Sequence, residues 1–286
     1  MPKVSIVLPS YNGARYLRES IDSCLNQTLA DLELIIVDDC SMDETPDILK
    51  SYNDPRMLII RHDVNKKLPG ALNTGFAASC GDYLTWTSDD NLYHPNALEV
   101  MVQALDSRPD LGLVYSGCRL VDEFGALIRI DMAEPPELLR QKSVVGACFL
   151  YRRTVYEQIG DYNADLFRIE DYEYWLRIAQ HCQIAALSDI LYDYRVHAGS
   201  VTSEETLVQR ARAYDDVQTK MFGPDPKRFK HYLGELYIAR AFEDYLAGRY
   251  RQVAPNVLRA LTCNQIFINN RGVWSIFFRS LLKGKV

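Results

Sequence analysis

The 286-residue sequence contains no apolar stretch that approaches the ~20 residues a helix needs to cross a bilayer. No segment is therefore predicted to span a membrane. The apolar run near the N-terminus, within residues 1–12, is also too short for the core of a secretory signal peptide. We interpret that run as the first strand of a folded domain.

Cysteine is present, but not in a pattern typical of a cross-linked or metal-binding domain. The seven cysteines are odd in number, lie scattered along the chain and include no Cys-x-x-Cys pair. This distribution argues against a disulfide framework and against a cysteine-based zinc site. It favours a reducing compartment, so we expect a cytoplasmic protein.

Two glycine-rich phosphate-binding signatures are missing as well. Neither G-x-G-x-x-G nor G-x-x-x-x-G-K-[ST] follows any predicted strand. Those motifs depend on glycine because the backbone must approach the phosphate closely. The sequence therefore supports neither a dinucleotide-binding fold nor a P-loop.

Acidic residues outnumber basic ones, with 38 Asp and Glu against 32 Lys and Arg and a formal net charge of −6. The charge is unevenly distributed along the chain. Residues 207–286 hold 14 Lys and Arg against 6 Asp and Glu, a net charge of +8, so residues 1–206 carry a net charge of −14. A basic C-terminal region suggests contact with an anionic partner. A helical surface that is basic by chance explains the same numbers equally well.

Short apolar strands alternate with amphipathic helices through about residue 121. This rhythm predicts an α/β fold, with a mostly parallel sheet and helices on both of its faces. A hairpin is expected between residues 119–121 and 127–130, and a helix over Glu170–His181. From residue 206 onward we predict only helices and loops. We therefore expect one domain over residues 1–205 and a helical C-terminal region over 206–286.

Polar side chains follow three of the predicted strands, at the point where each strand ends. They occupy Pro9–Asn12, Asp38–Asp39 and Ser88–Asn91. Ligands of such sheets bind outside the carboxyl ends of the strands. We therefore expect these three stretches to converge on one rim.

Four consecutive oxygen-bearing side chains make up Ser88–Asn91. The adjacent carboxylates of Asp89 and Asp90 repel each other unless a cation lies between them, and hard oxygen ligands suit Mg²⁺ or Mn²⁺. The alternative is a polar turn before a helix, with Asn91 as its cap and Pro95 in its first turn. Acidic turns of that kind are common.

Several blocks of the sequence resemble, in order and spacing, the family-2 glycosyltransferases. They are VSIVLPSYNG at 4–13, LELIIVDDCSMDET at 32–45, GDYLTWTSDDNLYHP at 81–95 and RIEDYEYWLRIA at 168–179. The resemblance covers roughly residues 3–200, and each block lies at a predicted strand end or helix start. It implies the GT-A fold, a Rossmann-like sheet flanked by helices, followed here by a helical C-terminal extension. The family members it resembles are inverting enzymes that use nucleotide-diphospho-sugars.

The resemblance also implies roles for individual residues in the first two blocks. Pro9, Tyr11 and Asn12 would line the nucleotide pocket, with Tyr11 stacked near the base. Asp39 would accept a hydrogen bond from the base, with Asp38 beside it. These five residues are the candidate donor-binding set at the first two strand ends.

The later blocks supply the implied metal site and catalytic base. Asp90 matches the metal-ligating carboxylate of the DxD element, with Asp89 beside it, and Asp171 matches the general base. His197 falls where relatives bring a loop over the diphosphate, although a packed or surface histidine is the alternative. Ser88 stands where many relatives have an aspartate, which leaves the number of protein ligands open.

The other assignments have structural alternatives too. Asp38 and Asp39 can instead cap the helix that follows them, and Tyr11 can be a packed turn aromatic. Glu170 and Asp171 lie in the first turn of a helix, where the helix dipole favours acids in any protein. The remaining histidines show no ligand spacing and receive no role: His62, His94, His181 and His231.

Together these roles predict an inverting glycosyltransferase, assisted by Mg²⁺ or Mn²⁺, that uses a UDP- or dTDP-linked sugar and a saccharide or lipid-linked acceptor. A second hypothesis is a nucleotide-sugar-binding or scaffold protein without turnover. A third is a nucleotidyltransferase, which would want a glycine-rich, basic triphosphate loop; residues 9–13 offer one Gly and no Lys. Nucleic acid is not expected as a partner.

The last predicted helix is both apolar and basic. Positions i, i+3, i+4, i+7 and i+8 are Trp274, Phe277, Phe278, Leu281 and Leu282, with Arg271, Arg279, Lys283 and Lys285 nearby. This pattern is typical of a helix that lies in the plane of a membrane surface, here the inner face of the cell membrane. It fits equally a helix that covers the core of the first domain or forms a dimer seam.

Overall fold

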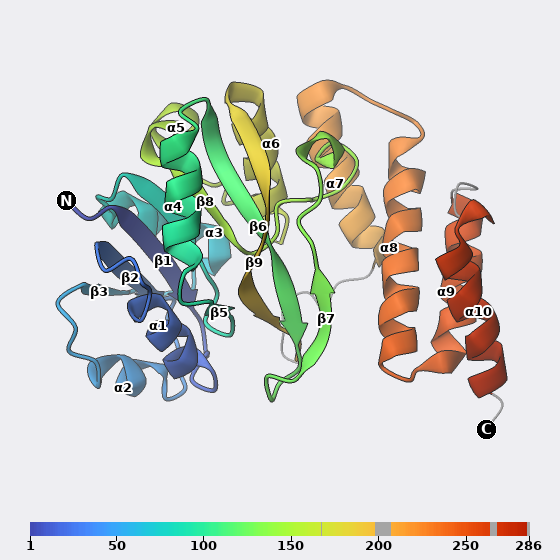
Figure 1. Cartoon of the computed structure of the whole chain (residues 1–286), viewed down its shortest axis with the longest axis horizontal. Helices are drawn as coiled ribbons and strands as arrows, with labels where there is room; N and C mark the ends of the chain where they lie inside the picture. Colours follow the sequence, from blue (N-terminus) through green and yellow to red (C-terminus); the bar gives the residue numbers. More distant parts are fainter. Residues whose placement is uncertain (167, 198–206, 264–267, 285–286) are drawn as a thin grey trace. The chain divides into compact units, whose positions relative to one another are not determined.

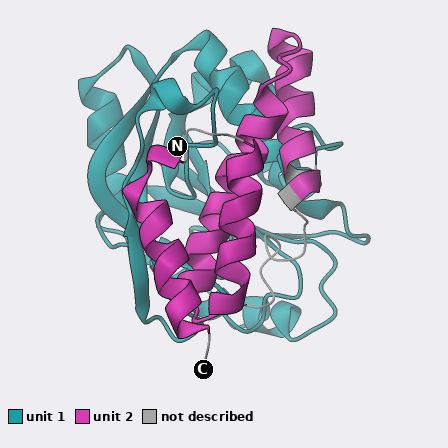
Figure 2. Ribbon diagram, turned by 90° about the vertical axis from the view of Figure 1, so that its right-hand side faces the viewer, with its two compact units in different colours: residues 1–200 teal, residues 201–286 magenta. Residues whose placement is uncertain are grey.

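The computed structural model describes residues 1–166, 168–197, 207–263 and 268–284. The chain divides into two compact units, Met1–Ser200 and Val201–Val286, which Figure 2 shows in different colours. The first unit is an α/β domain, and the described part of the second consists of helices (Figure 1). The domain boundary expected between residues 205 and 206 lies outside the described residues.

Four parallel strands make up the first part of the sheet, in the order β3-β2-β1-β4. They are β1 (Val4–Ser10), β2 (Leu32–Asp38), β3 (Met57–Arg61) and β4 (Tyr83–Trp86). All seven residues of β1 are buried, because strands pair along both of its edges and helices pack on both of its faces. This is why β1 is encoded by a nearly continuous apolar run rather than by alternation.

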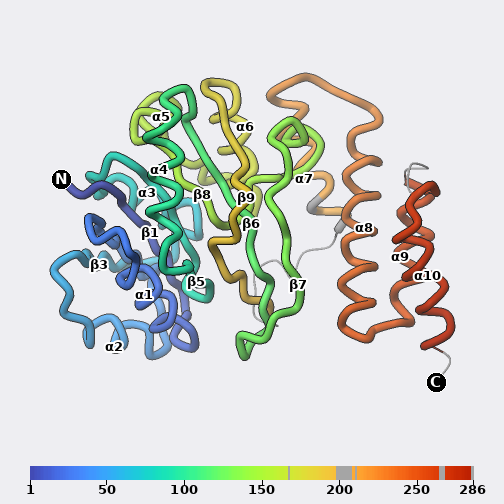
Figure 3. The backbone as a smooth tube through the Cα atoms, viewed as in Figure 1, coloured from blue at the N-terminus to red at the C-terminus, as the bar shows by residue number. Residues whose placement is uncertain are grey.

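Beyond β4 the sheet is mixed, and its order continues β8-β6-β9-β5 with β7 paired to β6. These strands are β5 (Leu92–Tyr93), β6 (Leu111–Val121), β7 (Leu127–Asp131), β8 (Phe149–Arg152) and β9 (Gln183–Arg195). Strand β8 runs antiparallel to both β4 and β6, whereas β9 runs parallel to β6. Figure 3 traces the backbone through these strands. The predicted α/β class is confirmed, and its parallel pairing is concentrated in the first four strands.

In this second part of the sheet, the sequence predicted the β6–β7 hairpin but not strand β9. The predicted hairpin is present as β6 and β7, which are antiparallel. The 13-residue strand β9 was not predicted, because its first half is only partly buried, does not alternate and holds an apolar run of only four residues, Ile184 to Leu187. It matters for the site, since its last residues reach the end of β4.

Helices cover both faces of the sheet. They are α1 (Leu17–Leu25), α2 (Thr45–Lys50), α3 (Lys67–Ala78), α4 (Ala97–Ser107), α5 (Arg153–Ile159) and α6 (Glu170–His181), with a short 3₁₀ helix η1 (Pro136–Leu138). Ile6 and Leu8 of β1 pack in one core with α1 and α4. Val7, which points to the opposite face, meets α3 at Gly75. The alternation of side chains along β1 thus joins both helical layers.

The described part of the second unit holds four helices: α7 (Leu207–Phe222), α8 (Arg228–Leu246), α9 (Tyr250–Cys263) and α10 (Arg271–Lys283). Helices α8, α9 and α10 share a separate apolar core built around Ala241, Val257 and Val273. Among the described helices, none is long and apolar enough to cross a membrane.

The contact between α3 and β1 generates a prediction about stability. A Cβ at position 75 would lie 2.3 Å from Val7 Cγ1, whereas a Cβ at the exposed Gly146 would meet nothing within 4 Å. We expect Gly75→Ala to lower the free energy of unfolding by ~1–3 kcal/mol through overpacking. Gly146→Ala, the control, should change it by less than ~0.5 kcal/mol. Urea unfolding followed by circular dichroism checks both, and a Gly75→Ala protein as stable as the parent would contradict this packing.

Candidate active site

The ends of β1 and β2 lie side by side because the two strands pair in register, with Ser10 opposite Asp38. Strand β4 flanks β1 on its other edge, with Trp86 opposite Val7. The three loops that follow these strands therefore leave the same edge of the sheet. The Asp39 N–H donates to the Ser10 carbonyl oxygen (2.8 Å), which extends the contact beyond the strands. The expected convergence of the three polar stretches is thus present at the level of the backbone.

Asp38 is buried, and both of its carboxylate oxygens are engaged. One accepts from the Ser41 N–H (2.9 Å) and the other from the Arg61 guanidinium (2.7 Å). Arg61 also donates to the Ser41 carbonyl oxygen (2.8 Å), so the ion pair closes the loop after β2. The alternative that Asp38 caps the next helix is wrong, because α2 begins only at Thr45. Asp38 holds the loop that carries its neighbour.

Asp39 is held from one side by His62. The Nδ1 atom of His62 lies 2.7 Å from Asp39 Oδ1, and the Lys66 N–H donates to the same oxygen (2.8 Å). On the far side of the imidazole, Nε2 lies 3.0 Å from Thr74 Oγ1. Within the described residues, Asp39 Oδ2 makes no hydrogen bond. Asp39 is therefore oriented by its neighbours while one oxygen stays available to a ligand.

The turn after β1 is shaped by Asn12, which adopts a left-handed conformation with φ of 55°. Its N–H donates to Ser41 Oγ (2.9 Å), and its side-chain oxygen accepts from the Met42 N–H (2.8 Å). Asn12 thus ties the first strand's turn to the second strand's loop. Tyr11, next to it, is 52% exposed, so it is not a packed turn aromatic. Pro9 is buried as the last but one residue of β1.

The same turn meets the acidic loop after β4 at Gly13 and Ser10. The Ser10 hydroxyl donates to Asp89 Oδ2 (2.5 Å). A Cβ on Gly13 would lie 1.9 Å from that same oxygen, so only glycine leaves room for the carboxylate. Burial and the adjacent Asp90 charge raise the pKa of Asp89 to about 7. The repulsion inferred from sequence between neighbouring acids is therefore present in the fold.

Asp90 lies between a hydroxyl and an imidazole. The Ser88 hydroxyl donates to Asp90 Oδ1 (2.6 Å), and His197 Nε2 lies 3.0 Å from Asp90 Oδ2. The His197 ring also packs against Tyr16, with 5.1 Å between ring centroids. Two sequence-predicted residues that are 107 positions apart are thus brought into contact.

These donors fit a hard divalent cation. Asp89 and Asp90 offer carboxylate oxygens and Ser88 offers a hydroxyl. Burial and the charge of Asp90 raise the pKa of Asp89, and a cation bound beside the two carboxylates would stabilise their ionised forms. Among the described residues, no group of three or more His, Cys, Asp or Glu side chains could form a complete cage. Mg²⁺ is often bound by only one or two carboxylates together with substrate phosphates, so such a cage is not required for this ion.

Arg195, at the end of β9, fixes the loop that carries Asp90, and the sequence offered no spacing signal for it. Its Nε donates to the Asp90 carbonyl oxygen (3.0 Å), and its backbone N–H donates to Asn91 Oδ1 (2.8 Å). Its guanidinium also pairs with Glu19 (2.6 Å) and lies over the Tyr16 ring. Asn91 is therefore not a helix cap; it joins β4 to β9.

Asp171 lies in the first turn of α6, as predicted, and its backbone neighbour Tyr172 donates its N–H to Asp171 Oδ1 (2.6 Å). Burial raises the pKa of Tyr162, and the charge of Asp171 adds a smaller contribution in the same direction. Tyr162 in turn accepts a hydrogen bond from Trp86 Nε1 (3.0 Å) at the end of β4. Its ring stacks on Tyr174 of α6 with 3.8 Å between centroids. Tyr162 thus connects the helix of Asp171 to the strand that leads to Asp90.

The expectation that Asp39, Asp90 and Asp171 all face one ligand stays a prediction. The contacts join Asp39 and Asp90 to the turn after β1, and they join Asp171 to β4 through Tyr162. Glu170, beside Asp171, is buried, and its Oε2 oxygen has no hydrogen-bond partner in the part of the chain that the structure describes. Burial and the adjacent Asp171 raise its pKa to about 8.

Backbone strain gathers in the same loops. The described non-glycine residues with positive φ are Asn12, Cys40, Lys67 and Arg168. The first three lie after β1, β2 and β3, and Arg168 precedes Glu170 by two residues. Left-handed conformations in non-glycine residues cost energy and cluster at functional sites. Their positions coincide with the predicted site.

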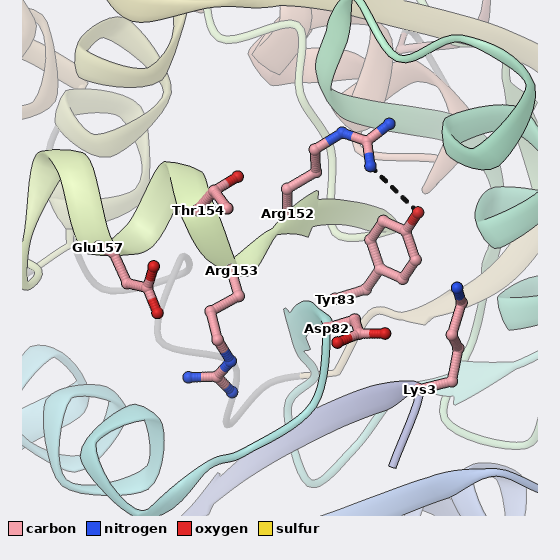
Figure 4. Close-up of a pocket in the computed structure, with 7 residues that line it drawn as sticks. All are labelled: Lys3, Asp82, Tyr83, Arg152, Arg153, Thr154 and Glu157. Atoms are coloured by element: carbon pink, nitrogen blue, oxygen red, sulfur yellow. Dashed lines mark hydrogen bonds between the residues drawn. The ribbon is translucent and has the colours of Figure 1, made fainter. Parts of the chain in front are cut away.

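A cavity of about 320 Å³ lies elsewhere, at the amino ends of β1 and β4 (Figure 4). Its lining residues are Lys3, Asp82, Tyr83, Arg152, Arg153, Thr154 and Glu157. The guanidinium of Arg152 donates to Tyr83 Oη (3.2 Å) and to the Leu111 carbonyl oxygen (2.8 Å). Arg153 donates to the Gly81 carbonyl oxygen (2.5 Å). These hydrogen bonds connect neighbouring strands and loops. The cavity lies at the amino ends of the strands, whereas the candidate site lies at their carboxyl ends, so the two are separate.

Comparison with known proteins gives the site its context. Residues 5–160 match the family model described as glycosyl transferase family 2. An uncharacterized glycosyltransferase of Rickettsia prowazekii is 31% identical over 229 residues, which are 76% of this chain and 70% of that protein. Other relatives are longer: the chain spans 35% of a Rickettsia felis glycosyltransferase that is 33% identical over 210 residues.

Solved structures show the same fold at lower identity. Staphylococcus aureus TarS 1-349 in complex with UDP-GlcNAc has a TM-score of 0.63 at 15% identity, over 91% of this chain and 81% of TarS. The mannosyltransferase PcManGT of Pyrobaculum calidifontis, in complex with GDP-Man and Mn²⁺, has a TM-score of 0.63 at 19% identity, over 99% and 85%. The GT-A fold expected from sequence is confirmed. The chain belongs to glycosyl transferase family 2 and is a glycosyltransferase.

Proposed function

We propose that the chain transfers a sugar, with inversion, from a uridine or thymidine diphosphate sugar to the hydroxyl of a saccharide or lipid-linked acceptor. The observation that carries this proposal is the joining of three strand ends through Asn12, Ser10 and Asp89. The Asn12 N–H binds Ser41 Oγ, and the Ser10 hydroxyl binds Asp89 Oδ2. One turn thereby links the loop that presents Asp39 to the loop that presents Asp90.

The loops after β1 and β2 form the nucleotide-binding part. Asp39 Oδ2 accepts a hydrogen bond from the base, and His62 keeps the carboxylate in place. The exposed ring of Tyr11 stacks near the base, and Pro9 and Asn12 shape the turn beneath it. A buried acceptor that is fixed before binding selects a base with a matching N–H donor. TarS, a structural neighbour, is seen with UDP-GlcNAc, which supports a uracil donor.

The loop after β4 forms the diphosphate part. Asp90, with Asp89 beside it, would hold Mg²⁺ or Mn²⁺ together with the diphosphate of the donor. The cation, when bound, offsets the negative charge that grows on the leaving diphosphate. His197 lies against Asp90, and we assign it the role of contacting the diphosphate oxygens. Arg195 keeps this loop in position through the Asp90 carbonyl oxygen.

Asp171 acts on the acceptor. Its carboxylate takes the hydroxyl proton while the acceptor oxygen forms a bond to the anomeric carbon. The bond between that carbon and the diphosphate oxygen breaks, and the diphosphate leaves with the electron pair. Attack from the face opposite the leaving group inverts the configuration. A positioned base of this kind contributes roughly 10²–10⁴ in rate.

Glu170 supports the base by remaining protonated. Its raised pKa means that burial disfavours a second charge beside Asp171. Two adjacent carboxyl groups that cannot both ionise readily divide into one acid and one base. Asp171, the less buried of the two, keeps the charge.

We place the protein in the cytoplasm, where nucleotide-sugars are the donors and the inner membrane face offers lipid-linked acceptors.

The metal assignment predicts the behaviour of Asp90→Ala. We expect Mn²⁺ to raise the melting temperature of the parent protein with uridine diphosphate, and this metal-dependent part to vanish in the variant. Transfer should fall at least ~100-fold, since the cation supplies several kcal/mol. Asp82→Ala, at the opposite end of β4, is the control. An unchanged metal-dependent shift in Asp90→Ala would remove Asp90 from the metal site.

The base assignment predicts that Asp171→Asn binds donor normally but transfers it ~10²–10⁴ times more slowly. Asp165→Asn, an exposed aspartate in the preceding loop, should leave both unchanged. Calorimetry with the donor and single-turnover transfer measure the two properties separately. A near-normal transfer rate in Asp171→Asn would show that another group takes the proton.

The state of Glu170 predicts a pH dependence of stability. Its pKa rises from 4.5 to about 8 on folding, so the unfolded chain releases a proton that the folded chain retains. The stability contributed by this group therefore falls as pH rises from about 4.5 to about 8. Glu170→Gln stays neutral, so relative to the parent it should gain roughly 1 kcal/mol or more across that range. Urea unfolding at several pH values tests this, with Glu157→Gln as the exposed control; parallel curves for parent and Glu170→Gln would contradict it.

A further inference from the structure

Helix α10 carries more apolar side chains than the core of its own unit uses. Val273 and Ile276 are buried in that core, Phe277 packs against it, and Ser280 is buried on the same side. These residues stand at i, i+3, i+4 and i+7, which is one face of a helix. The core of the C-terminal unit is therefore complete without the other apolar residues of α10.

A second apolar stripe runs along α10 beside the first. It consists of Trp274, Phe278, Leu281 and Leu282, at i, i+4, i+7 and i+8, and we call it the α10 outer face. Phe278 is 58% exposed, Leu281 44% and Leu282 75%. The five-residue stripe expected from sequence is thus divided, because Phe277 turns to the core and the other four turn outward.

The outer face is ordered by its own contacts. The Trp274 ring stacks on Phe278, with 5.9 Å between centroids and 27° between planes. Its indole N–H donates to the carbonyl oxygen of Ile268 (2.7 Å), and Ile268 is itself 50% exposed. The Phe278 ring is thus held in an exposed position, with the half-buried Trp274 ring beside it.

Positive charge surrounds this face. Arg271 stands at its N-terminal end and Arg279 along one side, and both are exposed. From residue 245 to the C-terminus the sequence holds seven Lys and Arg and no Asp or Glu. Arg249 pairs with Asp244 of α8, whereas Arg271 and Arg279 form no ion pair within the described residues, so the charge around the outer face favours an anionic partner.

We propose that the α10 outer face lies in the plane of an anionic phospholipid bilayer, with Trp274, Phe278, Leu281 and Leu282 in the acyl boundary and the arginines at the phosphate groups. Tryptophan, phenylalanine and leucine on one side of a helix with a basic flank are typical of such in-plane helices. Each basic residue near an anionic surface adds attraction that salt weakens.

A second copy of the chain fits this face less well. A two-fold interface brings the same patch of both copies together, so Arg271 and Arg279 would approach their own counterparts. The four side chains also form a small patch, whereas a stable interface buries about 800 Å² on each partner. A bilayer needs neither a larger area nor an acidic partner residue.

Vesicle sedimentation and tryptophan fluorescence of the full chain test the proposal. We expect binding to vesicles of phosphatidylcholine mixed with phosphatidylglycerol, weaker binding to phosphatidylcholine alone, and a loss of binding as salt is raised. Binding should shift the fluorescence to shorter wavelength, and Trp274→Phe should abolish that shift, because Trp175 is buried and Trp86 lies in the other unit.

Paired variants separate the outer face from general surface effects. Phe278→Ser with Leu282→Ser should lower the partition coefficient at least ~10-fold, since burying such side chains is worth more than 1.4 kcal/mol together. Leu258→Ser, a 53% exposed leucine of α9, should leave it unchanged. Arg271→Glu with Arg279→Glu should lower it ~10-fold or more on anionic vesicles, whereas Lys50→Glu in the first unit should not. Circular dichroism confirms that each variant is folded.

The proposal is overturned if the parent chain does not sediment with anionic vesicles, or if the paired serine variant binds them as well as the parent. It is also overturned if the parent is a dimer by light scattering and the serine variant is a monomer, since the face would then be covered by a second copy. None of these readouts depends on glycosyl transfer, so they stand apart from the proposed function.

Discussion

Negative charge held at the carboxyl ends of β1, β2 and β4 is the constraint on which the site depends. Asp38 and Asp39 are almost fully buried, and an ionised carboxylate in such a place is costly unless it is paired and hydrogen-bonded. The two carboxylates are stabilised by different partners. Arg61 neutralises Asp38 completely, whereas His62 and the Lys66 N–H engage a single oxygen of Asp39.

This difference separates acids that build the loops from acids that face a ligand. Asp38 has no oxygen left for a substrate, because its hydrogen bonds close the loop after β2. Asp89 and Asp90 remain a crowded pair, and burial together with the charge of Asp90 raises the pKa of Asp89. Neighbouring carboxylates that the protein does not neutralise are an arrangement that a divalent cation completes.

The late strand β9 has a large part in holding this arrangement. It runs parallel to β6 and antiparallel to β5, and its last residue, Arg195, reaches the backbone of Asp90. His197 follows two residues later and contacts the Asp90 side chain. The acidic loop after β4 is therefore fixed by a segment that comes about 100 residues later in the chain, and the site forms only when the whole sheet has assembled.

The sequence by itself determined the family, the α/β class and the residue types at the strand ends, because these depend on local hydrophobic patterns and on short motifs. It also placed α6, with Asp171 in the first turn, over the same residues as the structure. It could not identify His62 as the partner of Asp39, Tyr162 as the link to Asp171, or Arg195 as the support of Asp90. Those contacts join positions far apart in the chain, and no local periodicity encodes them.

Only the tertiary structure decided which face of a helix meets the core. Sequence periodicity grouped Phe277 with the other apolar residues of α10, whereas packing against α8 and α9 turned Phe277 inward and left Phe278 and Leu282 exposed. Adjacent stripes on one helix are equally apolar in sequence, and they differ only in whether another helix lies against them.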